Sequence, residues 1–424
     1  MRESELFTRC LRMLDDRGVG YVILHAYEDF PEVFAGDVDY AIAQTSWRSV
    51  TEMHRQLGTW DGWRRVQCLR HEATASYEVF MHREVPGCHL KLDFCSHYVR
   101  NGALLLDDRH LLQGRRRYKG FSVPAADVEY AYVLAKALAK EKDIESVKPV
   151  LRRLQLEDPE KCRDRAEKLI GKDGADQVDA CITADAELDV STLRQRMLHA
   201  HKVGVLLKLK EALRIVRRVL YPTGFSLAVL GPDGVGKSTV IDGLRRTLLP
   251  AFRRTVLMHF RPYTFEPNRD GPPNTNPHGV KPRAAPLALA KVFYYYFDHL
   301  VGHFTKVRPL KCRSSLVIFD RSYDDLIVDP LRFRIGGFRQ VTRVLRKMLP
   351  KHDLAIVLDA SPGEMIVRKQ ELSLDELARQ RDVFARLAAK ESNYLVIDAG
   401  RDPDEVLASC YAAVVDRLAQ RLNR

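Results

Sequence analysis

"LAVLGPDGVGKSTV", residues 227–240, is the stretch that decides the fold. The spacing G-x-x-x-x-G-K-[ST], typical of a phosphate-binding loop, is matched by Gly231, Gly236, Lys237 and Ser238. The uninterrupted apolar run at 227–230 predicts a buried strand, and residues 239–244 read as the start of a helix. Strand, loop and helix in this order are the context that the motif requires.

The loop motif predicts a binding site for a nucleoside triphosphate. Its glycines let backbone N–H groups turn toward a polyanion, and the N-terminus of the following helix adds partial positive charge. Lys237 is expected to reach the β- and γ-phosphates, and Ser238 to ligate Mg²⁺. We therefore predict ATP and Mg²⁺ as cofactors. The residues expected to hold them are Gly231, Asp233, Gly234, Val235, Gly236, Lys237, Ser238 and Thr239.

The composition is that of a globular protein with a basic surface. The chain has 424 residues, of which 46% are apolar and 29% charged, and its net charge is +12. Such an excess favours anionic partners: nucleotides, nucleic acid, phosphorylated sugars or an acidic membrane surface. The arginines are spread along the chain, so a basic solvated surface explains them equally well. The densest basic run, at 114–120, is too short to define a nucleic-acid site, and no motif supports one.

The sequence predicts a cytoplasmic protein. Its first residues mix acids and arginines and form an amphipathic helix rather than a signal peptide. The aromatic run at 287–304 contains Lys291 and Asp298 and is too polar to span a bilayer. The eight cysteines form no C-x-x-C pair, which favours free thiols in a reducing compartment. The oligomeric state is left open, a homodimer included.

The chain is too long for one compact core, and we expect an α/β protein of three domains. Residues 1–121 alternate helix and strand signals, whereas 122–222 carry apolar residues at helical spacing. Residues 223–424 alternate strands and helices again, as in a parallel sheet. Within them, 266–286 are rich in Pro, Asn and Gly and predict a long functional loop or a mobile segment.

Two further strands are expected to bring charged groups to the loop. "SSLVIFDRSYDD" (314–325) is an apolar strand that ends in Asp320 and Arg321, and "DLAIVLDA" (353–360) ends in Asp359. In open α/β sheets, ligands lie beyond the carboxyl ends of the strands. We therefore expect Asp320 near Ser238, where it binds Mg²⁺ directly or through water. Arg321 is suited to fork onto an acceptor phosphate or carboxylate, although a surface salt bridge is the simpler alternative.

"GPDGVGKST" (231–239) together with "DRSYDD" (320–325) resembles thymidylate kinase and its nucleoside-monophosphate-kinase relatives. Those proteins have an Asp within the phosphate loop and an acid-Arg element followed by an aromatic residue after a later strand. The closing segment, 393–418, is also similar to the last strand and helix of that family. The resemblance covers about 225–424. It implies a parallel-sheet kinase fold that transfers the γ-phosphoryl group of ATP to a nucleoside monophosphate, dTMP by likeness.

The resemblance also implies roles for individual residues. Asp233 would contact the sugar hydroxyl of the acceptor, Arg321 would hold its phosphate, and Tyr323 would line its pocket. Arg368 and Arg379 fall where the lid arginines would lie, with solvated helix positions as the equal alternative. Arg261, after another strand, is either a second anion clamp or a structural loop arginine. The catalytic set is then Lys237, Asp320, Arg321, Arg368 and Arg379.

Departures from the family leave the acceptor open. The insert at 262–311 is unlike the compact thymidylate-binding region, further basic residues follow at 329–337, and no Phe/Arg pair for thymine is evident. A sugar phosphate or a glycan end in bacterial surface polysaccharide synthesis is therefore an alternative acceptor. The other alternative is an ATP-gated binding or regulatory module with an inactive front domain.

The front of the chain carries a separate acidic pattern. Asp37 and Asp39 alternate along an expected strand and so face the same side, and Asp93 lies on a later strand. The pattern resembles the nucleotidyltransferase superfamily over about 18–145, in which three clustered carboxylates hold two metal ions. The Gly-Ser pair of that family is replaced by His25-Ala26. We therefore favour a degenerate nucleotidyltransferase-like α+β domain over an active one, with three surface acids as the remaining alternative.

Overall fold

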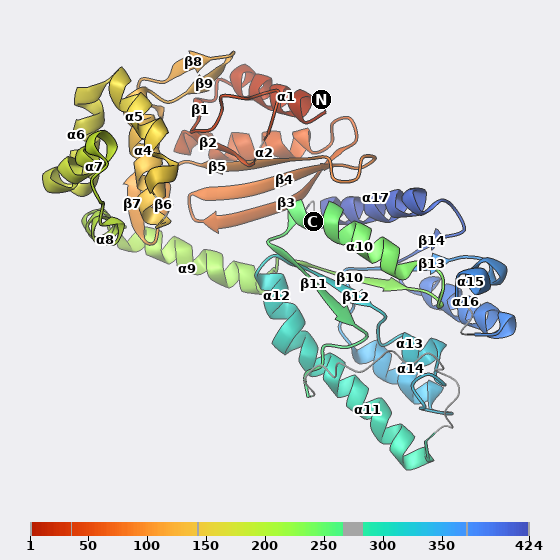
Figure 1. Cartoon of the computed structure of the whole chain (residues 1–424). Coiled ribbons are helices and arrows are strands. Elements are labelled where there is room, and N and C mark those ends of the chain that lie inside the picture. The colour runs from red at the N-terminus through yellow and green to blue at the C-terminus, as the bar shows by residue number, and fades with distance from the viewer. Residues whose placement is uncertain (1, 35, 142–143, 266–282, 370–371, 423–424) are drawn as a thin grey trace. The chain divides into compact units, whose positions relative to one another are not determined.

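The computed structural model describes residues 2–34, 36–141, 144–265, 283–369 and 372–422 (Figure 1). Most of the Pro- and Asn-rich segment predicted as a loop lies outside these ranges. The chain divides into two compact units. Unit 1 comprises Met1–Met81 and Cys88–Arg217, and unit 2 comprises His82–Gly87 and Arg218–Arg424. No helix within the described ranges has both the length and the apolar character needed to cross a bilayer.

Unit 1 is built on a mixed five-stranded sheet of order β1-β2-β5-β4-β3. β1 pairs antiparallel with β2, β2 parallel with β5, and β4 antiparallel with β5. The strands of unit 1 are β1 (Tyr21–Ile23), β2 (Val38–Ile42), β3 (Trp63–Glu72), β4 (Ala75–His82), β5 (His89–Cys95), β6 (Tyr98–Arg100), β7 (Ala103–Leu106), β8 (Arg116–Tyr118) and β9 (Phe121–Val123).

Two apolar cores hold unit 1 together. One core joins α1 and α2 to the sheet through residues such as Phe7, Met53 and Phe94. The other joins the sheet to α4–α8 through residues such as Ala41, Leu134 and Leu193. The helices are α1 (Arg2–Asp16), α2 (Trp47–Leu57), α3 (Asp108–Leu112), α4 (Ala126–Ala139), α5 (Lys148–Glu157), α6 (Pro159–Ile170), α7 (Lys172–Ala184), α8 (Val190–Ala200) and α9 (Val205–Leu220), with short 3-10 turns η1 (Gln44–Ser46) and η2 (Ile144–Ser146).

Unit 2 contains a parallel five-stranded sheet of order β11-β12-β10-β13-β14. β10, the strand predicted ahead of the glycine loop, is central and fully buried. Because all five strands are parallel, their carboxyl ends meet at one edge, as the sequence predicted for this half of the chain. The strands are β10 (Phe225–Leu230), β11 (Arg254–His259), β12 (Ser315–Asp320), β13 (Leu354–Asp359) and β14 (Tyr394–Asp398).

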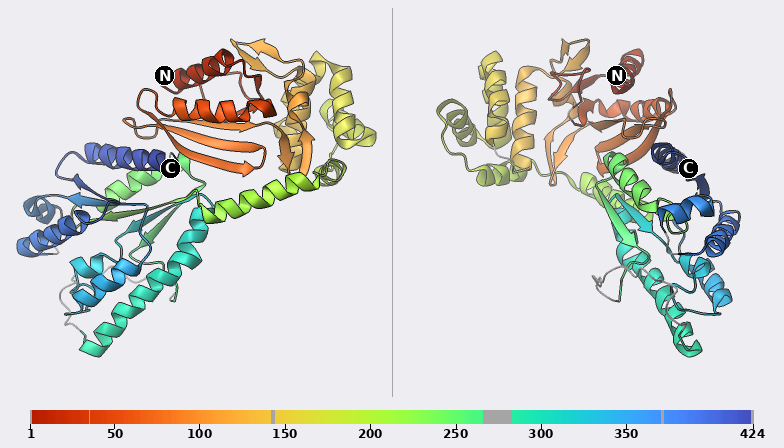
Figure 2. Two further views of the ribbon diagram at one scale, coloured as in Figure 1. Left: turned by 180° about the vertical axis from the view of Figure 1, so that it is seen from behind. Right: turned by 45° about the vertical axis from the view of Figure 1, so that its right-hand side comes forward.

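Helices cover both faces of this sheet (Figures 1 and 2). α16 packs on one face, where Phe384 joins a core with Leu230 and Phe319. α10 and α17 pack against each other and against the strands. The helices of unit 2 are α10 (Lys237–Thr247), α11 (Ala285–Gly302), α12 (Arg308–Cys312), α13 (Asp325–Val328), α14 (Arg339–Met348), α15 (Pro362–Arg368), α16 (Leu374–Ala388) and α17 (Pro403–Leu422), with the 3-10 turn η3 (Leu249–Ala251) and the π-helical turn η4 (His303–Val307).

Candidate functional site

The loop 231–236 connects the end of β10 to the first residue of α10, Lys237. Gly231 and Gly234 have φ of +142° and +82°, which favour glycine. A Cβ atom on Gly231 would lie 2.7 Å from the carbonyl oxygen of Leu358, and one on Gly234 would lie 2.6 Å from that of Met365. These two glycines therefore let the loop backbone press against the end of β13 and against α15.

Lys237 turns its side chain back over this loop. Its Nζ donates hydrogen bonds to the carbonyl oxygens of Gly231 and Pro232, both at 2.8 Å, and lies 3.6 Å from Asp233 Oδ1. Burial, together with the nearby Arg321 guanidinium, lowers the pKa of Lys237 to about 8. An anion bound beside this buried ammonium would stabilise its charged form.

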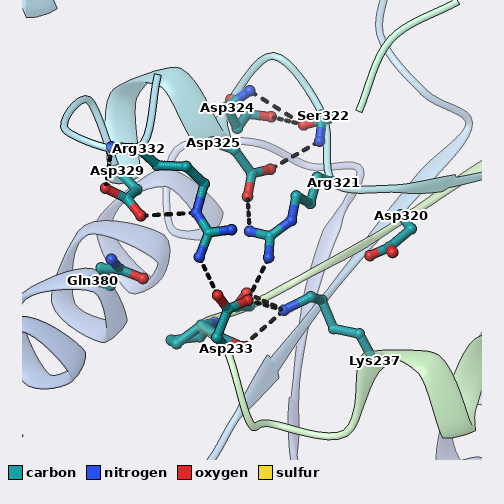
Figure 3. A network of polar contacts seen from close by, with 12 residues as sticks. Asp233, Lys237, Asp320, Arg321, Ser322, Asp324, Asp325, Asp329, Arg332 and Gln380 are labelled. Atoms are coloured by element: carbon teal, nitrogen blue, oxygen red, sulfur yellow. Dashed lines mark hydrogen bonds and ion pairs between the residues drawn. The ribbon is translucent and has the colours of Figure 1, made fainter. Parts of the chain in front are cut away.

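Asp233 accepts hydrogen bonds from the guanidinium groups of two arginines (Figure 3). Arg321 Nη2 donates to one carboxylate oxygen and Arg332 Nη2 to the other. The carboxylate is buried, which opposes its ionisation, but Arg321, Lys237 and Arg332 together hold the pKa of Asp233 well below its usual range. Three cationic side chains from different parts of the chain therefore converge on one ionised carboxylate at the mouth of the loop.

A second layer of carboxylates orients the two arginines. Arg321 Nη1 donates to Asp325 Oδ1 at 3.4 Å, and Arg332 Nε donates to Asp329 Oδ2 at 3.2 Å. Burial raises the pKa of Asp325 to about 6, although Arg321 and the backbone N–H of Ser322 oppose the rise. Arg321 itself has φ of +74°, a conformation that costs a non-glycine residue energy and is enriched at functional sites.

Asp320, at the carboxyl end of β12, was predicted to help hold Mg²⁺. Its Oδ2 lies 3.2 Å from His259 Nδ1, whereas its Oδ1 is buried and has no hydrogen-bond partner among the described residues. Ser238 is exposed in the first turn of α10. Carboxylate and hydroxyl oxygens are hard ligands of the kind Mg²⁺ prefers, and the Oδ1 of Asp320 has no partner among the described residues, so the chemistry of these two side chains fits Mg²⁺.

Arg368 and Arg379 have other partners in the structure. Arg368 Nη1 donates to the carbonyl oxygen of Ala399 at 3.3 Å. Arg379 pairs with Glu376 and donates to the carbonyl oxygen of Val328 at 2.7 Å. Glu376 and, more weakly, Asp329 raise the pKa of Arg379, so this arginine interacts with one acid of the second layer, and the role of Arg368 and Arg379 as lid residues stays a prediction.

Two further predicted residues are buried in an aromatic region: Tyr323, predicted to line the acceptor pocket, and Arg261, predicted to be a second anion clamp or a structural loop arginine. Arg261 pairs with Asp298 at 3.2 Å and donates to the hydroxyl of Tyr294 at 2.8 Å. Tyr323 packs edge-to-face on His299, and its buried hydroxyl has no hydrogen-bond partner among the described residues. Arg261 is thus compensated by a carboxylate, whereas Tyr323 keeps an unused polar group.

The clustered residues that sequence reasoning did not assign are Arg332, Asp325 and Asp329. The sequence carries a signal for Arg332, because 329–337 is a basic run that follows soon after Arg321. The acids at 325 and 329 lie four residues apart, at the first residue of α13 and just past its end. What the sequence lacked was the direction of the Arg332 side chain, since it contacts an acid 99 positions away.

Unit 1 brings the three predicted acids to one cavity of about 380 Å³, lined by Asp37, Asp39 and Asp93. Asp39 and Asp93 are direct partners in the parallel pairing of β2 with β5. Two side chains of unit 1 already contact the Asp39 carboxylate. His25 Nε2 lies 2.8 Å from its Oδ2, and Lys136 Nζ, from α4, donates a hydrogen bond to the same oxygen.

The charges in this cavity do not suit a two-metal site as they stand. Burial opposes ionisation of Asp39, but His25 and Lys136 hold its pKa well below the usual range. Burial and the neighbouring Asp39 charge raise the pKa of Asp93 to about 8. Asp37 pairs with Lys91 at 3.5 Å. Among the residues described, no group of three or more His, Cys, Asp or Glu side chains is arranged to hold a metal ion.

The fold of unit 2 is consistent with a P-loop kinase domain. Its sheet is parallel, the central strand leads into a glycine loop and a helix, and charged groups lie at the carboxyl edge of the sheet.

About half of the chain is homologous to thymidylate kinases. The thymidylate kinase of Xanthomonas campestris pv. campestris (strain B100) is 28% identical over 212 residues, which cover 48% of this chain and 88% of the relative. A probable thymidylate kinase of Pyrobaculum aerophilum is 28% identical over 212 residues, covering 47% and 97%.

Among solved structures, thymidylate kinase from Ehrlichia chaffeensis aligns with 44% of this chain and 96% of its own, at 17% identity and a TM-score of 0.31. No protein-family model matches the chain. The homology supports a kinase-type phosphotransfer at the level of the family, and it leaves the substrate of this chain undetermined.

Proposed function

We propose that unit 2 is an ATP- and Mg²⁺-dependent phosphotransferase that moves the γ-phosphoryl group to a nucleoside monophosphate, with dTMP as the first candidate. The observation that carries the proposal is the convergence of Lys237, Arg321 and Arg332 on Asp233 beside the glycine loop. Phosphoryl transfer needs positioning and charge neutralisation more than covalent chemistry, and three adjacent cations supply both.

In this proposal the loop and Lys237 hold the donor. The backbone N–H groups of 231–238 face the phosphates, and the Lys237 ammonium adds a phosphate oxygen to the two carbonyl oxygens it already contacts. Ser238 and Asp320 would hold Mg²⁺, whose positive charge neutralises the phosphates when it is bound. The Oδ1 of Asp320, which has no hydrogen-bond partner in the described part of the chain, supports this role.

Arg321 and Arg332 are proposed to bind the phosphate group of the acceptor. A guanidinium binds a phosphate through two parallel hydrogen bonds, and Arg321 and Arg332 flank the same carboxylate. In the absence of ligand, Asp233 neutralises both arginines; with the acceptor bound, its carboxylate is free to accept a hydrogen bond from a sugar hydroxyl. Tyr323, whose buried hydroxyl lacks a described partner, is proposed to line the pocket for the rest of the acceptor.

The test is a turnover assay with ATP, Mg²⁺ and a panel of nucleoside monophosphates and sugar phosphates. We expect dTMP or another nucleoside monophosphate to be phosphorylated, and Lys237→Ala to abolish the activity. Lys306→Ala is a matched control, because Lys306 Nζ also donates to two successive backbone carbonyls, those of Pro262 at 2.8 Å and Tyr263 at 2.7 Å. Turnover of sugar phosphates alone would contradict the proposed acceptor, and no turnover of any acceptor would contradict the kinase.

We further propose that the cavity of unit 1 binds a ligand without nucleotidyl transfer. The Lys136 ammonium donates a hydrogen bond to the Asp39 carboxylate, which a two-metal site would need as a metal ligand. Lys136→Met should free Asp39 and create affinity for Mn²⁺, measured by electron paramagnetic resonance. Mn²⁺ binding by the unaltered protein at this cavity, lost in Asp39→Asn, would contradict the proposal.

A further inference from the structure

Helix α9 presents an apolar face to solvent. No residue of this helix is buried. Positions 206, 209, 213 and 216 follow the three- and four-residue spacing of one helix face. We call this set, together with Val205, the apolar face of α9. The exposed fractions are 83% for Val205, 67% for Leu206, 56% for Leu209, 61% for Leu213 and 55% for Val216.

The polar side of the same helix is fixed to unit 1. Glu211 accepts a hydrogen bond from the backbone N–H of Ala73, and Arg214 Nη1 donates to the carbonyl oxygen of Arg70 at 3.1 Å. Arg214 Nε also donates to Glu211 at 2.8 Å. A surface helix ordinarily buries its apolar side and exposes its polar side. Here the arrangement is reversed, and an exposed apolar face of this kind marks an interaction surface.

Basic side chains flank the apolar face. Lys208, Lys210 and Arg217 are exposed beside it, and Glu211, the only acid of the helix, is turned toward Ala73 and Arg214. Two copies of this helix packed face to face would bring like charges together, which disfavours self-association. A basic rim around an apolar face is complementary to an anionic lipid surface, in which the apolar side chains enter the acyl boundary and the amines meet the headgroups.

We propose that α9 docks the protein on an anionic membrane surface. In this proposal the helix lies in the plane of the interface, since it has 16 residues and one apolar face. Binding is peripheral and reversible, and it combines insertion of the leucines with attraction of the three basic side chains. The proposal is independent of the phosphotransferase chemistry, because none of these residues belongs to the Asp233 cluster.

The experiment is vesicle flotation of the full chain with phosphatidylcholine alone and with phosphatidylcholine plus phosphatidylglycerol. We expect binding to the anionic vesicles only. The pair Leu209→Glu and Leu213→Glu should abolish it, whereas Leu156→Glu should not, because Leu156 is a 77% exposed leucine on α5. Replacing Lys208, Lys210 and Arg217 by Gln should weaken binding on the order of a hundredfold.

Three outcomes would overturn the proposal. One is no flotation of the unaltered protein with anionic vesicles, and another is equal flotation with phosphatidylcholine alone. The third is a dimer in solution, detected by light scattering, that Leu213→Glu dissociates, together with no binding to vesicles. The apolar face of α9 would then bind a second copy of the chain. Circular dichroism of each variant ensures that a lost interaction reflects the face and not unfolding.

Discussion

Replacing Asp233 by Asn removes the charge on which Arg321 and Arg332 converge and keeps the shape of the side chain. We expect the free energy of unfolding of unit 2 to fall and its affinity for a free phosphate anion to rise. Both follow from the same cause, since the carboxylate neutralises the cations that a phosphate would otherwise bind.

The expected loss of stability can be bounded from the contacts. Breaking a fully buried ion pair by removing one partner costs about 3–5 kcal/mol. The side chains of Arg321 and Arg332 are 22% and 19% exposed, and each retains a second carboxylate, Asp325 or Asp329. We therefore expect a loss of about 2 kcal/mol, or a fall of about 4–8 °C in the melting temperature of this unit.

The assay is calorimetric unfolding together with pyrophosphate binding at neutral pH. Asp359→Asn is the matched control, since Asp359 is another carboxylate of unit 2 that pairs with a guanidinium, Arg381 Nη2 at 2.9 Å, but this pair is more exposed than the Asp233 pairs. It should cost less than about 1 kcal/mol. Pyrophosphate should bind Asp233→Asn about tenfold more tightly than the unaltered protein, because one competing charge is gone. The reasoning is refuted if Asp233→Asn is as stable as the control, or if its affinity for pyrophosphate falls.

Three further predictions concern the same loop and its arginines. Because burial lowers the pKa of Lys237 to about 8, ATP affinity should fall about tenfold per pH unit above pH 8, and binding there should take up a proton. Calorimetry in two buffers of different ionisation enthalpy measures the proton uptake. An ATP affinity that stays constant to high pH would contradict this prediction. Gly234→Ala should weaken ATP binding by tenfold or more, since its Cβ would lie 2.6 Å from the carbonyl oxygen of Met365; unchanged affinity in an equilibrium titration would show that this contact does not shape the site. Arg332→Lys keeps the charge but loses the planar fork, so kcat/KM for the acceptor should fall about tenfold while the ATP Kd stays the same; equal losses for both substrates would place Arg332 on the donor side.

The parts of the site that the sequence predicts are local in the chain. The strand, glycine loop and helix around Lys237 follow from adjacent residues, and so does the position of Asp320 and Arg321 at the end of an apolar strand. Parallel pairing then brings these ends together without further information. The homology to thymidylate kinases over about half of the chain agrees with this interpretation.

The missing parts depend on contacts between distant residues. Arg332 reaches Asp233 across 99 positions, and Lys136 reaches Asp39 across 97. Nothing in the local pattern of either residue indicates its partner, because a charged side chain near a helix or turn is ordinarily solvated. The sequence therefore named Asp233 and the three acids of unit 1, but it missed Asp325, Asp329 and the cations Arg332 and Lys136.

Strand β3 is hard to recognise in the sequence for a related reason. Its sequence carries several arginines, which obscure the alternation expected of a half-buried strand. In the structure Arg65 is buried and pairs with the buried Glu78 of β4 at 3.3 Å. A buried ion pair across neighbouring strands thus takes the place of the apolar pair that a pattern search looks for.

The most direct measurement of the central claim is calorimetric titration of ATP with Mg²⁺ into the unaltered protein, Lys237→Ala and Lys306→Ala. The account predicts binding to the unaltered protein, unchanged affinity in Lys306→Ala, and a loss of about 10- to 100-fold in Lys237→Ala, as expected for one charge-assisted hydrogen bond. Equal affinity of Lys237→Ala and the unaltered protein, or no heat of binding with any purine triphosphate, would contradict it.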